Sequence, residues 1–156
     1  MQRIVIFCYL FLITACTHVD NVETKVLNEY LIEVGKSEIL TANQVFIVVP
    51  LFSGCHSCES EILSFAKSNI DLKNIFYILS MHEKNSKHFN MLKASEFANS
   101  MPINFITEFK DLAMKKDMVF TESKIYFVEN GNVFKTVKLT AINIKEELIA
   151  LKEYLK

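Results

Sequence analysis

The chain has 156 residues, of which 51% are hydrophobic, and its 17 basic residues nearly balance 18 acidic ones. This length suits one domain with its own apolar core. The near-neutral charge and the lack of a basic tract argue against nucleic-acid binding. No apolar run in the sequence is long enough for a transmembrane helix.

The N-terminal residues have the pattern of an export signal. Arg3 supplies a positive charge, residues 4–13 are almost wholly apolar, and small residues lead into Cys16. The tetrad Ile13-Thr14-Ala15-Cys16 resembles the bacterial lipobox, in which the cysteine is lipidated on its sulfur and becomes the new N-terminus. The alternative is an ordinary signal peptide cut after Ala15, with Cys16 a spare thiol.

We therefore expect three parts in the chain: a lipoprotein signal peptide over residues 1–15, a polar tether over 16–24 with lipid on Cys16, and a folded domain over 25–156. Such a protein would be held at a membrane of the cell envelope and would face the periplasm. Thr17 stands where lipoproteins kept at the inner membrane of enteric bacteria typically have Asp, which points to the outer membrane.

The rest of the chain alternates strand and helix patterns. Apolar runs at 45–49, 75–79 and 124–128 predict buried strands, and Pro50 should end regular pairing or create a bulge. The other patterns predict helices over about 55–69, 87–100 and 108–116, a helix or edge strand over 25–32, a short strand over 103–106, an Asn-Gly hairpin turn at 129–132, its return strand over 133–139 and a final helix over 142–155. This order predicts an α/β fold whose mixed sheet has helices on both faces.

The segment Cys55-His56-Ser57-Cys58 is the most informative motif. It follows a predicted strand and opens a helix, so the first sulfur lies at a helix N-terminus, where free N–H groups and the helix dipole stabilise a thiolate. The second sulfur, three residues later, can close a disulfide. With Cys8 removed and Cys16 lipidated, only this pair remains, and its loop is too short to stabilise the fold strongly. We expect Cys55 to be a nucleophile and Cys58 a resolving thiol; a static disulfide is the alternative.

Two neighbouring side chains are candidates for tuning the pKa of Cys55. A protonated His56 would favour the thiolate and make the disulfide more oxidising, unless the side chain is simply exposed and without influence. Glu59 suits the start of a helix, but its like charge opposes a thiolate. The distances at the site decide which effect is larger.

Other chemistries match the sequence less well. Cys55, His56 and Cys58 are possible zinc or copper ligands, but adjacent residues diverge on a helix, and His82 and His88 lie in a polar loop. A peroxiredoxin-type site needs Thr or Ser three residues before its cysteine, where this chain has Phe52. We expect no bound metal and no cofactor besides the Cys55–Cys58 disulfide.

The order of elements, with C-x-x-C at the start of the first crossover helix, resembles the thioredoxin-like fold, a three-layer α/β/α arrangement. It is most similar to the exported, membrane-anchored TlpA-like proteins of bacteria. The resemblance covers roughly residues 40–156 and rests on Gly54 to Cys58 after a strand and on Lys124 to Gly131 near the end. It implies a thiol–disulfide oxidoreductase that acts on envelope protein thiols and disulfides, mostly as a reductant, and is recharged by a separate electron donor or acceptor.

Three positions depart from the pattern of that family. Gly54 replaces a tryptophan, Val49 occupies the position of a buried carboxylate, and Ser123 occupies the position of a cis-proline opposite the disulfide. A cis bond before a residue other than proline costs about 2.5–4 kcal/mol, so we expect Glu122–Ser123 to be trans or the loop to differ. These departures leave a second interpretation open: a thioredoxin-fold binding or assembly module whose disulfide is structural or vestigial.

Overall fold

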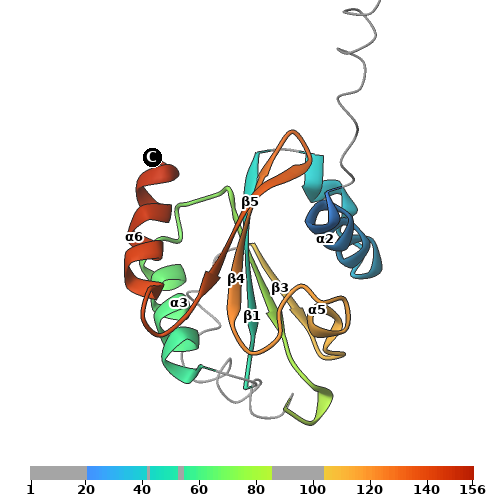
Figure 1. Ribbon diagram of the computed structural model, residues 1–156, viewed down its shortest axis with the longest axis horizontal. Coiled ribbons are helices and arrows are strands. Elements are labelled where there is room, and N and C mark those ends of the chain that lie inside the picture. The colour runs from blue at the N-terminus through green and yellow to red at the C-terminus, as the bar shows by residue number, and fades with distance from the viewer. Residues whose placement is uncertain (1–20, 42, 53–54, 86–103) are drawn as a thin grey trace, which may run out of the picture.

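The computed structural model describes residues 21–41, 43–52, 55–85 and 104–156 (Figure 1). Sequence expectations for the signal peptide, Cys16, Gly54 and the helix over 87–100 lie outside these residues. The described elements are, in chain order, α2 (Val22–Glu33), η1 (Ser37–Thr41), β1 (Gln44–Pro50), α3 (His56–Ser68), β2 (Ile75–Ser80), η2 (Glu83–Asn85), β3 (Phe105–Glu108), α5 (Leu112–Lys115), β4 (Ser123–Glu129), β5 (Asn132–Leu139) and α6 (Ile144–Tyr154).

The strands form one five-stranded sheet in the order β3-β2-β1-β4-β5. Strands β1, β2 and β3 are parallel, and β4 pairs antiparallel with both β1 and β5. Val48 of β1 lies opposite Lys124 of β4. Because β1 ends where β4 begins, the segment after β1 and the segment before β4 meet at the same end of the sheet.

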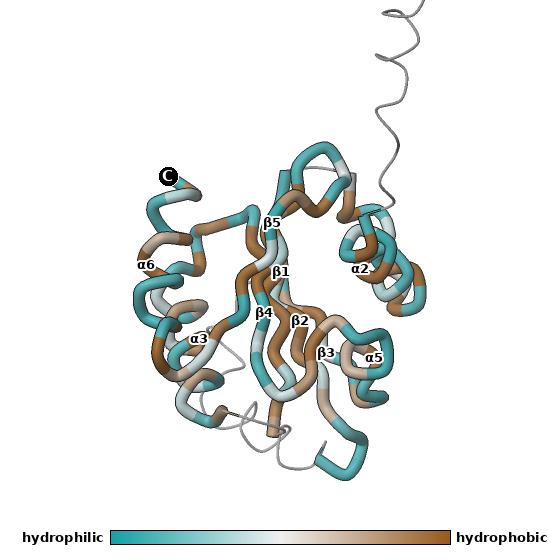
Figure 2. Tube along the Cα trace, in the orientation of Figure 1, coloured by the Kyte–Doolittle hydropathy of each residue, from teal (hydrophilic) through white to brown (hydrophobic). Residues whose placement is uncertain are grey.

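Helices cover both faces of this sheet. Figure 1 shows α3 and α6 on one side and α2 and α5 on the other. Alternate β1 residues belong to different cores: Val45, Ile47 and Val49 pack with α3 and α6, whereas Phe46 and Val48 pack with α2 and α5. Strands buried on both faces explain the continuous apolar runs in the sequence, which Figure 2 shows gathered at the centre of the sheet.

The arrangement is a thioredoxin-like α/β fold: a strand–helix–strand unit, then a β-hairpin and a helix, in three layers. The predicted mixed sheet, its late hairpin and helices on both faces are confirmed. The Asn-Gly turn forms as expected, with φ of 50° at Asn130 and 77° at Gly131, values that favour asparagine and glycine. Pro50 is the last residue of β1, also as expected.

The predicted tether boundary at residue 24 is wrong, because residues 21–24 belong to the folded domain. Helix α2 begins at Val22, and the Oδ1 atom of Asn21 caps it by accepting from the N–H groups of Glu23 and Thr24. The Asn21 amide donates to the carbonyl of Val133, and the Thr24 hydroxyl accepts from the N–H of Val133 at 2.8 Å. These bonds attach the start of α2 to the β4–β5 hairpin.

Two further elements differ in extent from the predictions. The short strand expected over 103–106 runs from Phe105 to Glu108, and the helical stretch expected over 108–116 is only Leu112–Lys115. The helix starts late because Glu108 is still in the sheet and Asp111 has a left-handed backbone, with φ of 55°. Among the helices that the structure describes, none combines the length and apolarity needed to cross a membrane.

Candidate redox site

A disulfide between Cys55 and Cys58 lies where the chain passes from the end of β1 into α3. Their Cα atoms are 5.2 Å apart, a normal separation for a disulfide. Cys55 is the N-cap of α3 and is half-buried, whereas Cys58, in the first turn, is 1% exposed and belongs to the core beneath the helix. The two sulfurs therefore differ in their access to a partner protein.

The surroundings of the Cys55 sulfur suit a negative charge. Its Sγ atom accepts from the backbone N–H of Cys58 at 3.3 Å, and the Ser57 hydroxyl oxygen lies 3.1 Å away. The N-terminal dipole of α3, a helix of 13 residues, adds partial positive charge at the same place. This is the thiolate-stabilising arrangement predicted from the C-x-x-C spacing.

Glu59 links the turn before the disulfide to the helix after it. Its Oε1 atom accepts from the backbone N–H of Phe52 at 2.9 Å, and its Oε2 atom lies 3.4 Å from Nδ1 of His56. The Glu59 side chain is 11% exposed, whereas that of His56 is 79% exposed. Phe52 has a φ of 61°, unusual for a side chain of this size, so the bond from Glu59 supports a strained turn.

Two of the positions that depart from the thioredoxin pattern, Val49 and Ser123, lie around this site. Val49 is fully buried in the same core as Cys58, so strand β1 contributes no carboxylate there. Ser123 is buried at the start of β4, at the end of the sheet that carries the disulfide. None of the peptide bonds in the described residues is cis, so the bond between Glu122 and Ser123 is trans, as expected.

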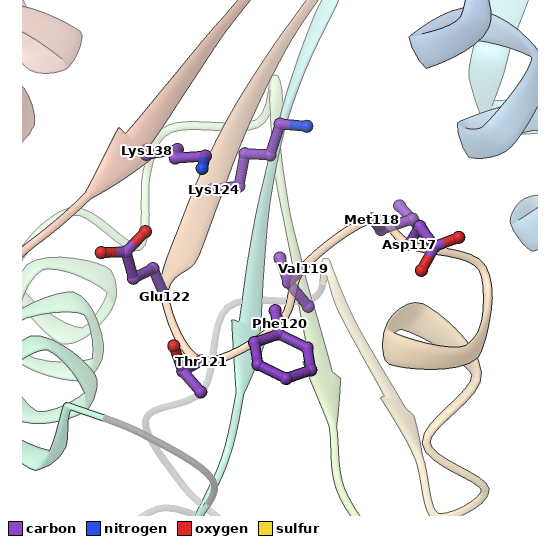
Figure 3. Close-up of a pocket in the computed structure, with 8 residues that line it drawn as sticks. All are labelled: Asp117, Met118, Val119, Phe120, Thr121, Glu122, Lys124 and Lys138. Carbon is purple, nitrogen blue, oxygen red and sulfur yellow. The ribbon is translucent and has the colours of Figure 1, made fainter.

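A pocket of about 440 Å³ opens beside the segment that leads into β4 (Figure 3). Lys124 of β4 and Lys138 of β5 lie side by side above it, and Glu122 and Thr121 extend from the loop. Phe120, on the same loop, is 80% exposed. Sequence reasoning missed this aromatic side chain; a phenylalanine in the segment 117–123, between two predicted elements, was the available signal.

A second polar cluster, also missed, lies on the face of the sheet that is opposite the disulfide. Glu108 of β3 is buried and accepts hydrogen bonds from the Ser80 hydroxyl, from the N–H of Lys110 at 2.7 Å and from the N–H of Ala113 at 3.3 Å. These bonds place its charge at the start of α5 and attach that helix to the sheet. Burial, and then the nearby Glu108 charge, raise the pKa of the Tyr30 hydroxyl above its ordinary value.

Of the two histidines expected in the polar loop, the structure describes His82, whose contacts are with Asp111 and Lys84. His82 lies 4.0 Å from Asp111 through Nε2, and its Nδ1 accepts from the N–H of Lys84. His88 is outside the described residues. In the part of the chain that the structure describes, no three histidine, cysteine or acidic side chains are grouped so that they could hold a metal ion.

No family model and no curated protein matches the chain. Similar solved structures include a candidate thioredoxin from Neisseria meningitidis, 15% identical with a TM-score of 0.47, which covers 74% of this chain and 79% of the other. Another is the bacterioferritin comigratory protein of Xanthomonas campestris, described in connection with alkyl peroxide reduction. It is 14% identical with a TM-score of 0.46 and covers 74% of this chain and 82% of the other.

Proposed function

We propose that this chain is a thiol–disulfide oxidoreductase with Cys55 as its nucleophile and Cys58 as its resolving thiol. The observation that carries the proposal is the asymmetric pair at the start of α3. The more accessible sulfur is the N-cap and accepts a backbone N–H, and its partner is buried one turn into the helix. A disulfide kept only for stability does not need either feature.

The reaction would run in two exchanges. In the reduced protein, the Cys55 thiolate attacks one sulfur of a partner disulfide, a mixed disulfide forms, and the first partner thiolate leaves and takes up a proton. Cys58 then loses its proton and attacks the Cys55 sulfur, which releases the second partner thiol and closes the Cys55–Cys58 disulfide. Two electrons pass to the partner, and an electron donor of the dithiol class returns them by the reverse exchange.

Partner proteins would contact the segment that leads into β4. Ser123 begins this strand at the disulfide end of the sheet, and the exposed ring of Phe120 lies on the preceding loop. An exposed aromatic side chain can bury a large apolar area against a partner at a small entropic cost. We expect protein thiols and disulfides of the cell envelope as partners.

We further propose that the protein is a lipoprotein of the TlpA-like type, anchored through Cys16. The lipobox-like tetrad supports this, and so does the position of α2. Its capping residue Asn21 is bonded to Val133, beside the turn between β4 and β5, whereas the disulfide lies at the other end of the sheet. A lipid-anchored domain of this kind would present its disulfide away from the membrane, toward periplasmic partners.

The alternative function is that of a binding or assembly module with a structural disulfide. One observation favours it: among the described residues, the core next to Cys58 contains Val49 and no strand carboxylate that could accept the proton of a resolving thiol. In this interpretation the pocket beside Lys124 and Lys138 would contribute to a binding surface, and the disulfide would stay closed.

The reduction potential separates the two functions. A soluble form that starts after Cys16 is equilibrated with glutathione or dithiothreitol, and free thiols are trapped and counted. A reversible transition between about −120 and −270 mV, the span of catalytic pairs, is the expected result. A disulfide that stays closed until below about −300 mV would contradict the enzyme and favour the module.

A further inference from the structure

Glu59 has a different environment from the other charged groups near the disulfide. It follows Cys58 directly, its side chain is nearly buried, and its two oxygens contact groups on either side of Cys55: the N–H of Phe52 and the ring of His56. By contrast, Glu61 on the same helix is 41% exposed and lies 3.5 Å from Lys145 of α6. Of these two carboxylates on α3, Glu59 is therefore the one that places a poorly hydrated negative charge at the redox pair.

The compensation of this charge is weak. Among the ion pairs of the described residues, the one basic partner of Glu59 is His56. That side chain is 79% exposed, so water screens any positive charge on it, whereas the Glu59 carboxylate is 11% exposed and is screened much less. The negative charge should therefore have the larger effect on the sulfurs.

A negative charge beside a dithiol disfavours the thiolate, and the thiolate is the form that stabilises the reduced protein. Glu59 should therefore shift the equilibrium toward the closed disulfide. The reaction is protein dithiol plus partner disulfide giving protein disulfide plus two partner thiols, and the charge favours its right-hand side. This makes the reduced protein a stronger reductant.

We propose that Glu59 is a positioning residue of the redox site, which holds the Phe52 turn against α3 and whose buried charge sets the pair as an electron donor. The inference rests on the proposed exchange function. It gives the direction of electron flow, which the C-x-x-C motif alone leaves open.

The test compares Glu59→Gln, which keeps a hydrogen-bond acceptor but removes the charge, with Glu61→Gln as the matched control on the same helix. The full chain is purified in detergent and equilibrated with a graded dithiothreitol series, and the Cys55–Cys58 state is read by thiol trapping and peptide mass spectrometry. We expect Glu59→Gln to shift the equilibrium about tenfold toward the dithiol, a potential about 30 mV higher. Glu61→Gln should change it less than about twofold, because its charge is exposed and paired.

A Glu59→Gln equilibrium within about twofold of the unmodified protein would overturn the proposal. So would a shift that appears in Glu59→Ala but not in Glu59→Gln, because the hydrogen bond rather than the charge would then be responsible. A shift in both variants supports the role of the charge. The alkylation rate of Cys55 as a function of pH gives a second readout: its midpoint should fall in Glu59→Gln and stay unchanged in Glu61→Gln.

His56→Gln keeps the test decisive if Glu59→Gln does not fold, because the His56 side chain is mostly exposed. Because this side chain is screened by water, its removal should change the equilibrium by less than about twofold. A larger movement would overturn the proposed charge balance, because the histidine and not the carboxylate would then dominate. The unmodified protein in the same series tests the exchange function separately. A pair that stays closed until below about −300 mV refutes that function, while the ratio between variant and unmodified protein still decides the role of Glu59.

Discussion

Reduction of the disulfide should weaken the fold only moderately, and the size of the effect can be worked out from the structure. The disulfide closes a loop that spans only Cys55 to Cys58. For so short a loop, the chain-entropy relation gives about 6 cal/mol/K, or about 2 kcal/mol at 25 °C. Cys58 stays in a core that already contains Val49, Ile62 and Tyr77, so its packing survives reduction. The reduced protein should therefore remain folded, as an exchange enzyme requires.

The assay is urea unfolding of the oxidised and the dithiothreitol-reduced protein, followed by circular dichroism. We expect the oxidised form to be more stable by about 2 kcal/mol. A thermodynamic cycle links this value to redox chemistry: 2 kcal/mol corresponds to a folded disulfide about 40 mV harder to reduce than the same disulfide in the unfolded chain. The reasoning is refuted if the reduced form is the more stable one, as in strongly oxidising pairs, or if the reduced chain is unfolded.

Three further results are expected. Glu108→Ala should lower the free energy of unfolding by about 3 kcal/mol, because the bonds that Ser80 and the start of α5 make to this carboxylate are lost. Urea unfolding measures this loss. Glu129→Ala is the exposed control and should change the free energy of unfolding by less than about 0.5 kcal/mol. Phe120→Ala should slow exchange with a protein disulfide several-fold and leave the rate of reaction with dithiothreitol unchanged. The reason is that the exposed ring contributes to partner contact and not to the chemistry. Equal slowing of both reactions would argue against that role. Burial raises the pKa of Tyr77 above its unfolded value of about 10. The contribution of the neutral Tyr77 side chain to stability is therefore complete below pH 10. As the pH rises further, this contribution is lost by about 1.4 kcal/mol per pH unit. Tyr77→Phe should therefore reduce the alkaline loss of stability and cost little at pH 7, because its hydroxyl has no hydrogen-bond partner among the described residues. Unfolding at pH 7 and pH 11 tests both statements.

Much of the fold was predictable because its strands are buried on both faces. The runs at 45–49, 75–79 and 124–128 are long, apolar and rich in β-branched and aromatic residues, and each lies within an observed strand. The disulfide was predictable for a similarly local reason. A C-x-x-C directly after such a strand places both sulfurs at one helix start without any long-range information.

The parts that escaped prediction depend on contacts between distant segments. The sequence predicts a polar tether over residues 16–24, yet the side chains of Asn21 and Thr24 bond Val133, more than 100 residues away. The role of Glu108 depends on Ser80, the last residue of the neighbouring strand β2. No periodic pattern signals such bonds, since one polar residue in a strand is equally compatible with an exposed position.

The location of the buried charge distinguishes this site from one in which the carboxylate comes from the central strand. Val49 gives the central strand β1 no carboxylate below the disulfide, and Glu59 instead places a carboxylate on α3, next to Cys58. Because that carboxylate also holds the N–H of Phe52, the same side chain supports the turn before the disulfide and supplies the charge that acts on it. Loosening of the turn would therefore move the charge and change the redox equilibrium together. A substitution that keeps the bond but removes the charge is the one that separates geometry from electrostatics at this site.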